Sequence, residues 1–395
     1  MNKRLHHLPP QPWAAEHPTR QYRPGASLFA SPRAVLAARG AKALLPPCTA
    51  GRLAGDALAM LRDAGGPGDV IMGAVPFDAA APARLFVPEQ ISVGPALATG
   101  HAPPAAHRRK PHAVHARPSP DAYRANVERA LACIRATGLE KVVLSRSLSL
   151  NVQVDLAGLL QRLAARNSRG YTFAIDLVDA PAPRRTLIGA SPELLLSRRG
   201  RQLLSHPLAG SVPRSSDPRE DRRRGAALLE SAKDLHEHEL VVAAVADSLR
   251  PFARQVWVPP RPSLLSTPTM WHLGTEVKAE LADPACSSLE LALALHPTPA
   301  VCGHPLQQAR RFIGDVEGFE RGYFAGLVGW CDTSGDGEWA VTLRCAEVGE
   351  HDATLYAGAG IVDGSVAEDE LLETSGKLRT MLAAMGLESV LETMQ

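Results

Sequence analysis

The 395-residue sequence lacks the features of membrane, secreted and disulfide-rich proteins. Its longest uninterrupted apolar run, residues 240–246, is far shorter than the ~20 residues of a membrane-spanning helix. The basic first residues are not followed by the apolar segment of a secretory signal. The six cysteines have no C-x-x-C spacing, so neither a disulfide framework nor a zinc knuckle is expected. These absences predict a cytoplasmic protein.

Strong charge of either sign is also missing. Lys and Arg together number 43 against 41 Asp and Glu, which leaves a net charge of +2. That balance gives no overall attraction to nucleic acid or to an anionic membrane. The run of three arginines at residues 222–224 is offset by Asp217, Glu220 and Asp221. We therefore expect neither nucleic acid nor a membrane as a partner.

Proline divides the chain into unequal parts. Of 33 prolines, 18 lie within residues 1–120, where long regular elements are accordingly scarce. We expect a tail over residues 1–25, then a proline-rich part over residues 26–120 packed on the core. Its last stretch, residues 101–120, has the composition of an exposed linker. Residues 121–395 are expected to form the core of one compact domain.

Beyond residue 120 the hydrophobic patterns become regular. Ser119 and Pro120 suit the start of a helix, and residues 140–151 alternate as a strand does. Residues 194–204 form a predicted hairpin turning at Arg199 and Gly200. Long helical patterns cover residues 225–249 and 367–385. Because strands and helices come in blocks, the sequence predicts an α+β fold with large antiparallel sheets.

Two charged residues stand in apolar surroundings. Lys141 begins the strand predicted over 140–151, and Glu193 lies between a Ser-Pro kink and three leucines. Burial lowers the pKa of an amine and raises that of a carboxyl, so the two could serve as a base and an acid. Each also has a structural interpretation, a lysine at a sheet edge and a turn carboxylate in water.

Two helical segments carry carboxylates on one face. Asp234, Glu237 and His238 are spaced i, i+3, i+4, and Glu370, Glu373 and Lys377 are spaced i, i+3, i+7. Carboxylates with several waters are typical of Mg²⁺ sites. A solvated, salt-bridged face is the alternative for each helix taken alone.

In order along the chain, these segments resemble a known family. The chain resembles isochorismate synthases of the enterobactin and bacillibactin type, among the chorismate-utilising enzymes of menaquinone, siderophore and tryptophan synthesis. The resemblance extends over nearly the whole chain from about residue 25. The segments that carry it are 29–33 (FASPR), 73–78 (GAVPFD), 141–146 (KVVLSR), 189–196 (GASPELLL), 207–211 (PLAGS), 233–240 (KDLHEHEL), 296–303 (HPTPAVCG), 329–332 (GWCD), 342–345 (TLRC), 356–362 (YAGAGIV) and Glu373-Thr374 with Lys377.

The resemblance implies two stacked antiparallel sheets flanked by helices, with the site in a cleft between them. It implies Mg²⁺-dependent conversion of chorismate to isochorismate, in which water adds at C2 and the C4 hydroxyl leaves. Lys141 would be the general base and Glu193 the general acid. Glu237 and Glu373 match the magnesium ligands, and Asp234 and Glu370 are candidate partners through water. Six further positions match substrate contacts: Gly210, His296, Ala300, Arg344, Gly358 and Lys377.

The resemblance leaves neighbouring functions open. A salicylate synthase would also eliminate pyruvate, and a menaquinone-pathway synthase would make the same product. Anthranilate and aminodeoxychorismate synthases use ammonia, usually from a glutaminase subunit, which is not expected here; a monomer is. A non-catalytic chorismate-binding protein would need neither Lys141 nor Glu193. Ala300, where amine-transferring relatives tend to carry threonine, suits the isochorismate branch, which would supply 2,3-dihydroxybenzoate for a siderophore.

Overall fold

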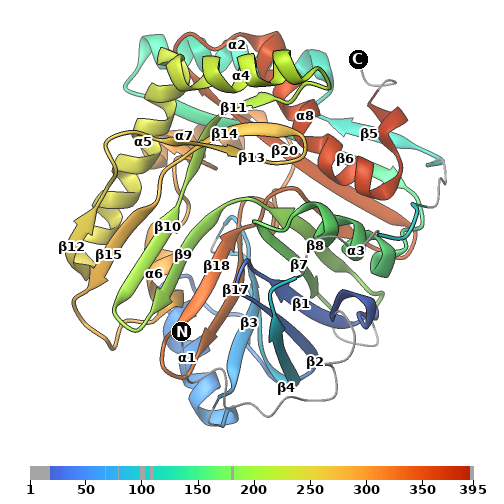
Figure 1. Ribbon diagram of the computed structural model, residues 1–395, viewed down its shortest axis with the longest axis vertical. Coiled ribbons are helices and arrows are strands. Elements are labelled where there is room, and N and C mark those ends of the chain that lie inside the picture. The colour runs from blue at the N-terminus through green and yellow to red at the C-terminus, as the bar shows by residue number, and fades with distance from the viewer. Residues whose placement is uncertain are drawn as a thin grey trace.

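The computed structural model describes residues 18–66, 68–78, 80–97, 103–106, 111–178 and 182–391 (Figure 1). Its strands form one long antiparallel strip, which curls so that its two halves face one another, and a separate three-stranded sheet. In order of pairing, the strip consists of β5 (Val114–Arg117), β6 (Lys141–Asn151), β20 (Asp352–Val362), β19 (Cys345–Val348), β8 (Thr186–Ser191), β7 (Tyr171–Asp176), β1 (Ala26–Ala30), β2 (Ala34–Leu44), β4 (Arg84–Pro95), β3 (Val70–Val75), β17 (Leu327–Asp332), β18 (Gly337–Val341), β9 (Leu194–Arg199), β10 (Gln202–His206), β15 (Val277–Leu281) and β12 (Ala253–Trp257).

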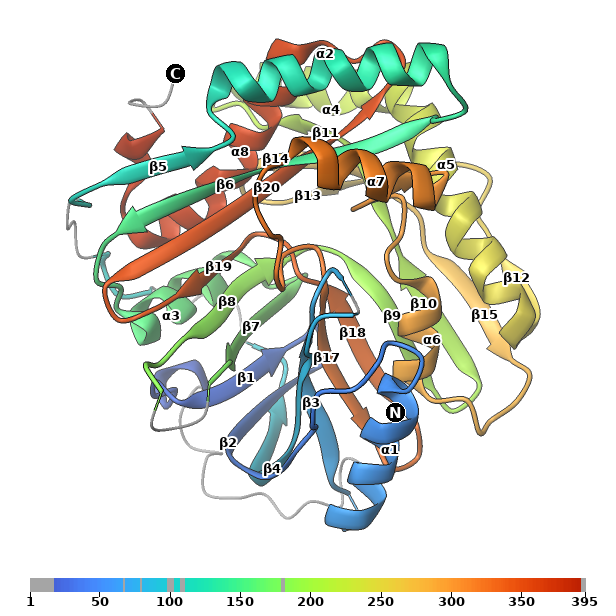
Figure 2. The same cartoon turned by 180° about the vertical axis from the view of Figure 1, so that it is seen from behind.

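The short strand β16 (Gly303–His304) pairs with the beginning of β6. The small sheet contains β11 (Leu208–Pro213), β14 (Met270–Gly274) and β13 (Ser263–Ser266). Helices cover the outside of the sheets (Figures 1 and 2). They are α1 (Leu53–Ala64), α2 (Pro120–Ala136), α3 (Leu156–Arg166), α4 (Pro218–Glu230), α5 (Ala232–Leu249), α6 (Ser288–Leu295), α7 (Leu306–Val316) and α8 (Ala367–Met385). Single 3₁₀ turns are η3 (Pro18–Arg20), η4 (Arg250–Phe252) and η5 (Glu388–Val390). The predicted α+β class with antiparallel sheets is confirmed.

Several predicted elements occur where the patterns placed them. Ser119 caps α2 by accepting a hydrogen bond from the Ala122 N–H, and β6 begins at Lys141. Strands β9 and β10 form the predicted hairpin. The helix predicted over 367–385 is α8, which ends where Gly386 takes a left-handed conformation, with φ of 76°. Local sequence therefore determined these boundaries.

Two predictions were wrong in detail. The single helix expected over residues 225–249 is two helices, because Ser231 ends α4 and its hydroxyl caps α5 through the Asp234 N–H. The expected linker 101–120 contains β5, which pairs with β6; Val114 and Ala116 are half-buried while His115 and Arg117 are exposed. That alternation is a strand signal hidden within a basic, proline-rich composition. Residues 101–102 and 107–110 of that stretch, and residues 1–17 of the tail, lie outside the described ranges.

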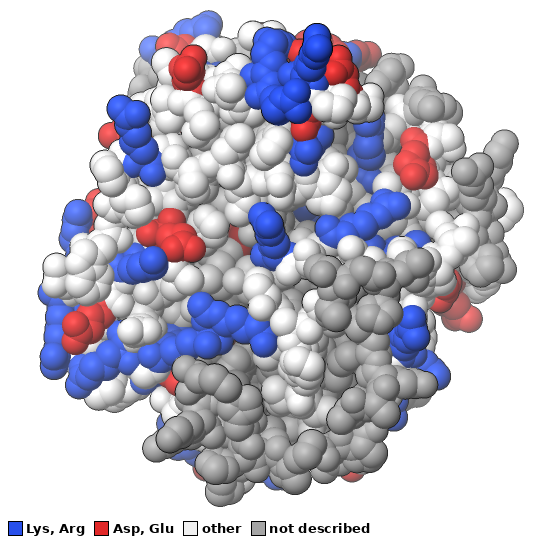
Figure 3. Space-filling view, viewed as in Figure 1, with Lys and Arg blue, Asp and Glu red and all other residues white. Residues whose placement is uncertain are grey.

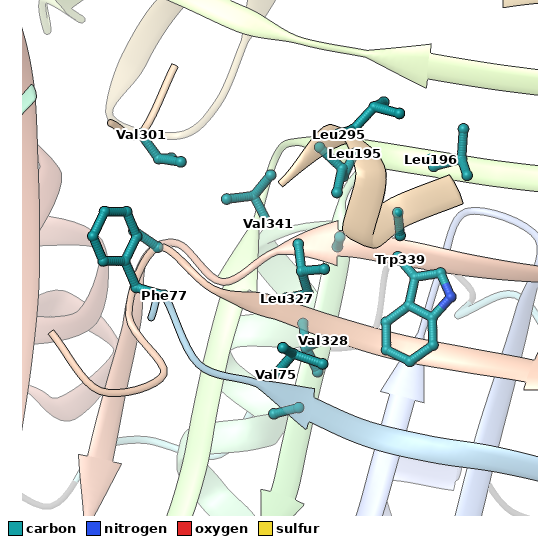
Figure 4. Packing of buried hydrophobic residues seen from close by; sticks show 14 of the residues in the cluster. Val75, Phe77, Leu195, Leu196, Leu295, Val301, Leu327, Val328, Trp339 and Val341 are labelled. Atoms are coloured by element: carbon teal, nitrogen blue, oxygen red, sulfur yellow. The ribbon is translucent and has the colours of Figure 1, made fainter. Parts of the chain in front are cut away.

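The larger hydrophobic core lies beneath β3, β9, β17 and β18 (Figure 4). Val75, Leu327 and Val341 meet there from three adjacent strands, and Leu295 arrives from α6. A second core joins β6 and β20 to α3 and α8. In the described part of the chain, no helix is both long and apolar enough to cross a membrane.

Charged side chains are mixed on the surface. On the face shown in Figure 3, basic side chains at the top of the view, over α4, have acidic side chains beside them. Arg223 and Arg224 both pair with Glu220, and Arg214 pairs with Asp221. Two arginines of the run 222–224 are therefore ion-paired with a glutamate of the same helix.

Candidate functional site

The site is a cavity between the two halves of the molecule. It encloses about 620 Å³ between the atoms, the solvent at its mouth included. Strands β6, β11, β14 and β20 contribute to its wall, as do helices α5 and α8. The lining residues are Val143, Ser145, Pro192, Glu193, Leu208, Ala209, Gly210, Ser211, Glu237, His272, Ala300, Val301, Phe324, Ala325, Leu343, Arg344, Gly358, Gly360, Glu373 and Lys377.

Lys141 lies just behind this wall, fully buried at the first residue of β6. Its Nζ is 2.9 Å from Oε1 of Glu237 on α5. The contact is an ion pair without the angles of a hydrogen bond, since Nζ has no hydrogen-bond partner among the described residues. Gly360 leaves room for the pair, because a Cβ there would lie 2.0 Å from Glu237 Oε1. Lys141 is therefore buried with one charged partner and spare hydrogen-bonding capacity.

Glu193 enters the cavity from the turn between β8 and β9. Its N–H donates to Ser191 Oγ (3.2 Å) and its carbonyl accepts from the Val341 N–H (3.2 Å), so its backbone is fixed on both sides. The side chain is 2% exposed. Burial raises the pKa of this carboxyl to about 7, although Lys141 and Arg344 oppose the shift. A substantial fraction therefore holds a proton at neutral pH.

Glu373 and Lys377 occupy one face of α8. Lys377 Nζ lies 2.5 Å from Glu373 Oε1 and donates to the carbonyl oxygen of Gly358 on β20 (2.8 Å). Lys377 thereby links the Glu373 carboxylate to β20, the strand that also carries Gly360. The alternative of a solvated face does not hold for these two residues, because both are largely buried and line the cavity.

Four carboxylates face one another between α5 and α8. Burial raises the pKa of Asp234, and the charges of Glu237 and Glu373 raise it further. Burial likewise raises the pKa of Glu370 to about 7, with Glu373 adding to the shift and Lys233, 2.9 Å away, opposing it. Three of the four carboxylates are each paired with a lysine. Only Glu237 and Glu373 of the four line the cavity.

The donor set is compatible with Mg²⁺ but not with a protein-only cage. The described residues contain no group of three or more His, Cys, Asp or Glu side chains arranged around a metal position. Mg²⁺ keeps several waters and takes one or two carboxylates together with substrate oxygens. Glu237 and Glu373 fit that requirement.

Arg344 faces the cavity from a strained position between β18 and β19. Its φ is 48°, and the side chain is 7% exposed. Burial lowers its pKa to about 10, so the guanidinium stays charged at neutral pH. Its Nη2 donates to Nε2 of His272 (3.4 Å), a buried residue of β14. Burial and the Arg344 charge hold the pKa of His272 well below its usual value, so the neutral ring can accept.

Sequence patterns gave no sign of His272. It is a lone histidine on a short strand, and only the folded structure brings it to Arg344. The stretch 356–362 contains Gly360, but its pattern does not indicate that this glycine lies at the site. Its role depends on the Lys141–Glu237 pair, which joins segments almost a hundred residues apart.

Most predicted substrate positions line the cavity, and one does not. Gly210 and Ala300 are in the wall. Gly210 has φ of 75°, and a Cβ there would approach the Asp234 Cβ to 3.0 Å. His296 is not in the described wall; its Nε2 bonds the Phe77 carbonyl oxygen at 3.2 Å. Burial lowers the His296 pKa to about 4, so the ring is neutral and supports the loop before Ala300.

Comparison with known proteins gives the same family throughout. Residues 91–386 match the model of the chorismate binding enzyme family. Isochorismate synthase DhbC of Bacillus subtilis is 51% identical over 392 residues, covering 95% of this chain and 97% of that protein. The vibriobactin-specific isochorismate synthase of Vibrio cholerae is 46% identical over 321 residues, covering 81% of this chain and 80% of that one.

Solved structures support the fold. DhbC of Bacillus anthracis, described as a 2,3-dihydroxybenzoate-specific isochorismate synthase, aligns with a TM-score of 0.88 at 46% identity, over 93% of this chain and 98% of that one. Anthranilate synthase component I of Streptococcus pneumoniae aligns with a TM-score of 0.68 at 22% identity, over 91% and 90% of the two chains. The second likeness concerns the fold alone.

Proposed function

This chain belongs to the chorismate-binding enzymes, and from that premise we propose that it is an isochorismate synthase. The reaction adds water at C2 of chorismate and expels the C4 hydroxyl. One observation carries the proposal: a buried carboxyl with a pKa raised to about 7 and a buried lysine serve the same cavity from separate walls. An exchange of hydroxyl groups needs one group to take a proton and another to give one.

Glu193 is the proposed acid. A carboxyl protonated near neutral pH can deliver its proton to the departing C4 hydroxyl, which would otherwise leave as hydroxide. Its backbone bonds to Ser191 and Val341 hold it in place. Loss of the proton leaves a carboxylate near the positive charges of Lys141 and Arg344, which stabilise it.

Lys141 is the proposed base for the attacking water. Lys141 is paired with Glu237, and the same carboxylate is a proposed ligand of the magnesium ion. Binding of Glu237 to the metal would release Lys141 to contact the attacking water. The absence of further hydrogen bonds to Nζ among the described residues leaves the amine free to contact water.

Glu237 and Glu373 are the proposed ligands of Mg²⁺, which would hold the ring carboxylate of chorismate by charge. Asp234 and Glu370 would contact it through water. The assignment is supported by the position of Glu237 and Glu373, which reach the same cavity from two helices. Arg344, with its guanidinium oriented by His272, is placed to bind the enolpyruvyl carboxylate. Gly210, Ala300, Gly358 and Lys377 complete the substrate wall, and His296 supports it from behind.

The names of the similar proteins favour a siderophore role. The Vibrio cholerae relative is vibriobactin-specific and the Bacillus anthracis structure is described as 2,3-dihydroxybenzoate-specific. We propose that this enzyme supplies isochorismate for 2,3-dihydroxybenzoate. Because water is the nucleophile, we further propose that the enzyme needs no glutaminase subunit. We also propose that it is a cytoplasmic monomer.

Product analysis tests the function directly. Purified protein with chorismate and Mg²⁺ should give isochorismate in equilibrium with chorismate, with little salicylate or pyruvate. Chromatography coupled to a pyruvate assay measures both. Stoichiometric pyruvate would instead identify a salicylate synthase, and incorporation of nitrogen from ammonium would identify an amine-transferring enzyme. Binding of chorismate without turnover would leave only a binding protein.

A further inference from the structure

Ser145 presents a buried hydroxyl that nothing in the described protein satisfies. The residue is 1% exposed, it lines the cavity, and its Oγ has no hydrogen-bond partner among the described residues. Buried polar atoms are rarely left unpaired, and an exception calls for a missing water or ligand. This one lies in the wall of a substrate cavity.

The backbone of Ser145 is held rigidly. Its N–H donates to Oε1 of Glu317 (2.8 Å), which is itself paired with Arg321 at 2.5 Å. Arg321 also donates to the carbonyl oxygens of Val143 (2.8 Å) and Val301 (2.7 Å). Both of those residues line the cavity, so one buried ion pair fixes two of its walls around Ser145.

The opposite strand is shaped to leave this hydroxyl uncovered. Gly358 pairs with Ser145 in the β6–β20 register, and a Cβ at Gly358 would lie 2.7 Å from Ser145 Oγ. Any larger residue would therefore block the hydroxyl. This gives a steric reason for glycine at position 358.

We propose that Ser145 is a further substrate-binding residue, whose hydroxyl hydrogen-bonds an oxygen of chorismate. This inference rests on the proposed function. Ser145 lies four residues, or about 13 Å, along β6 from Lys141, so its partner is an oxygen away from C2. The enolpyruvyl carboxylate and the C4 hydroxyl of chorismate are of the required class, because a serine hydroxyl can donate or accept.

The test compares two buried serines that both lack a partner. Ser205 on β10 is also 1% exposed and its Oγ is unpaired among the described residues, but it is outside the cavity wall. Ser145→Ala should lower kcat/KM for chorismate roughly 5- to 50-fold, the range expected for a lost hydrogen bond to a neutral or charged oxygen. Ser205→Ala should change it less than about twofold. Both variants should melt within a few degrees of wild type.

Three outcomes would overturn the proposal. The first is a Ser145→Ala enzyme with kcat/KM close to that of wild type, which would leave the hydroxyl to a structural water. The second is an equal loss in Ser205→Ala, which would make the effect general to the fold. The third is a large fall in the melting temperature of Ser145→Ala, which would mean that the hydroxyl has a partner within the protein. Turnover by wild type, measured first, tests the proposed function separately.

Discussion

Two buried ion pairs flank strand β6, and they differ in how completely their atoms are bonded. In the Glu317–Arg321 pair, both residues are 3% exposed by side chain and Arg321 also bonds two backbone carbonyls. In the Lys141–Glu237 pair, Nζ of the lysine has this ion pair but no hydrogen bond to any residue that the structure describes. In the first pair, Arg321 bonds protein carbonyls, which stabilises the structure. In the second pair, Lys141 Nζ can still form hydrogen bonds to a bound molecule. Completeness of bonding thus separates a structural charge from a functional one.

The largest expected effect is the loss of activity on removal of the metal that we propose to bind beside the second pair. Chelator should abolish turnover of chorismate, and added Mg²⁺ should restore it. Without the cation, the carboxylates of Glu237 and Glu373 would repel the ring carboxylate. Glu237→Ala and Glu373→Ala should raise the Mg²⁺ concentration for half-maximal activity and raise KM. Steady-state kinetics over a magnesium titration measures this. Full activity in excess chelator would disprove the metal site.

The next largest effect is the loss of turnover on substitution of the proposed base, Lys141, or the proposed acid, Glu193. Lys141→Ala and Glu193→Gln should each lose roughly 10²–10⁴-fold in kcat, the usual contribution of a general acid or base. Glu193→Gln leaves no charge unpaired, so its circular dichroism and melting temperature should stay near those of wild type. Lys141→Ala removes the ion-pair partner of the buried Glu237 carboxylate, so circular dichroism should show a folded protein with a lower melting temperature. Near wild-type turnover by Lys141→Ala would remove that residue from the mechanism.

The contrast between the pairs also shows where sequence reasoning succeeded and stopped. Lys141 and Glu193 stood out because each interrupts an apolar segment, and α8 was bounded correctly by its periodicity and Gly386. Glu237 and Glu373 came together only through the family resemblance, since their helices are far apart along the chain. The segment 141–146 does not reveal the role of Ser145, because whether its hydroxyl has a partner depends on residues that only the fold brings near it.

Matched substitutions in the two pairs sharpen the contrast in stability. Glu317→Gln strands the Arg321 guanidinium, which cannot lose its proton, and should cost about 3–5 kcal/mol of unfolding free energy. Glu237→Gln should cost clearly less, because the Lys141–Glu237 contact is a single ion pair in which Nζ makes no hydrogen bond to the described residues. Urea denaturation of both variants, with wild type as reference, measures the difference. Equal losses would show that bonding to the backbone does not distinguish the pairs.

The smallest effect is a pH dependence of stability from Glu193. Burial raises its pKa from 4.5 to about 7, so the folded protein holds this proton more tightly than the unfolded chain does. Its favourable contribution is fully present below pH 4.5, falls as pH rises through about 7, and changes no further above that. Glutamine cannot ionise, so Glu193→Gln should gain stability relative to wild type across that window and keep a constant advantage at higher pH. Melting temperatures of both proteins measured from pH 4.5 to 8.5 test this; a difference independent of pH would mean that Glu193 is ionised throughout, and would leave the departing hydroxyl without its acid.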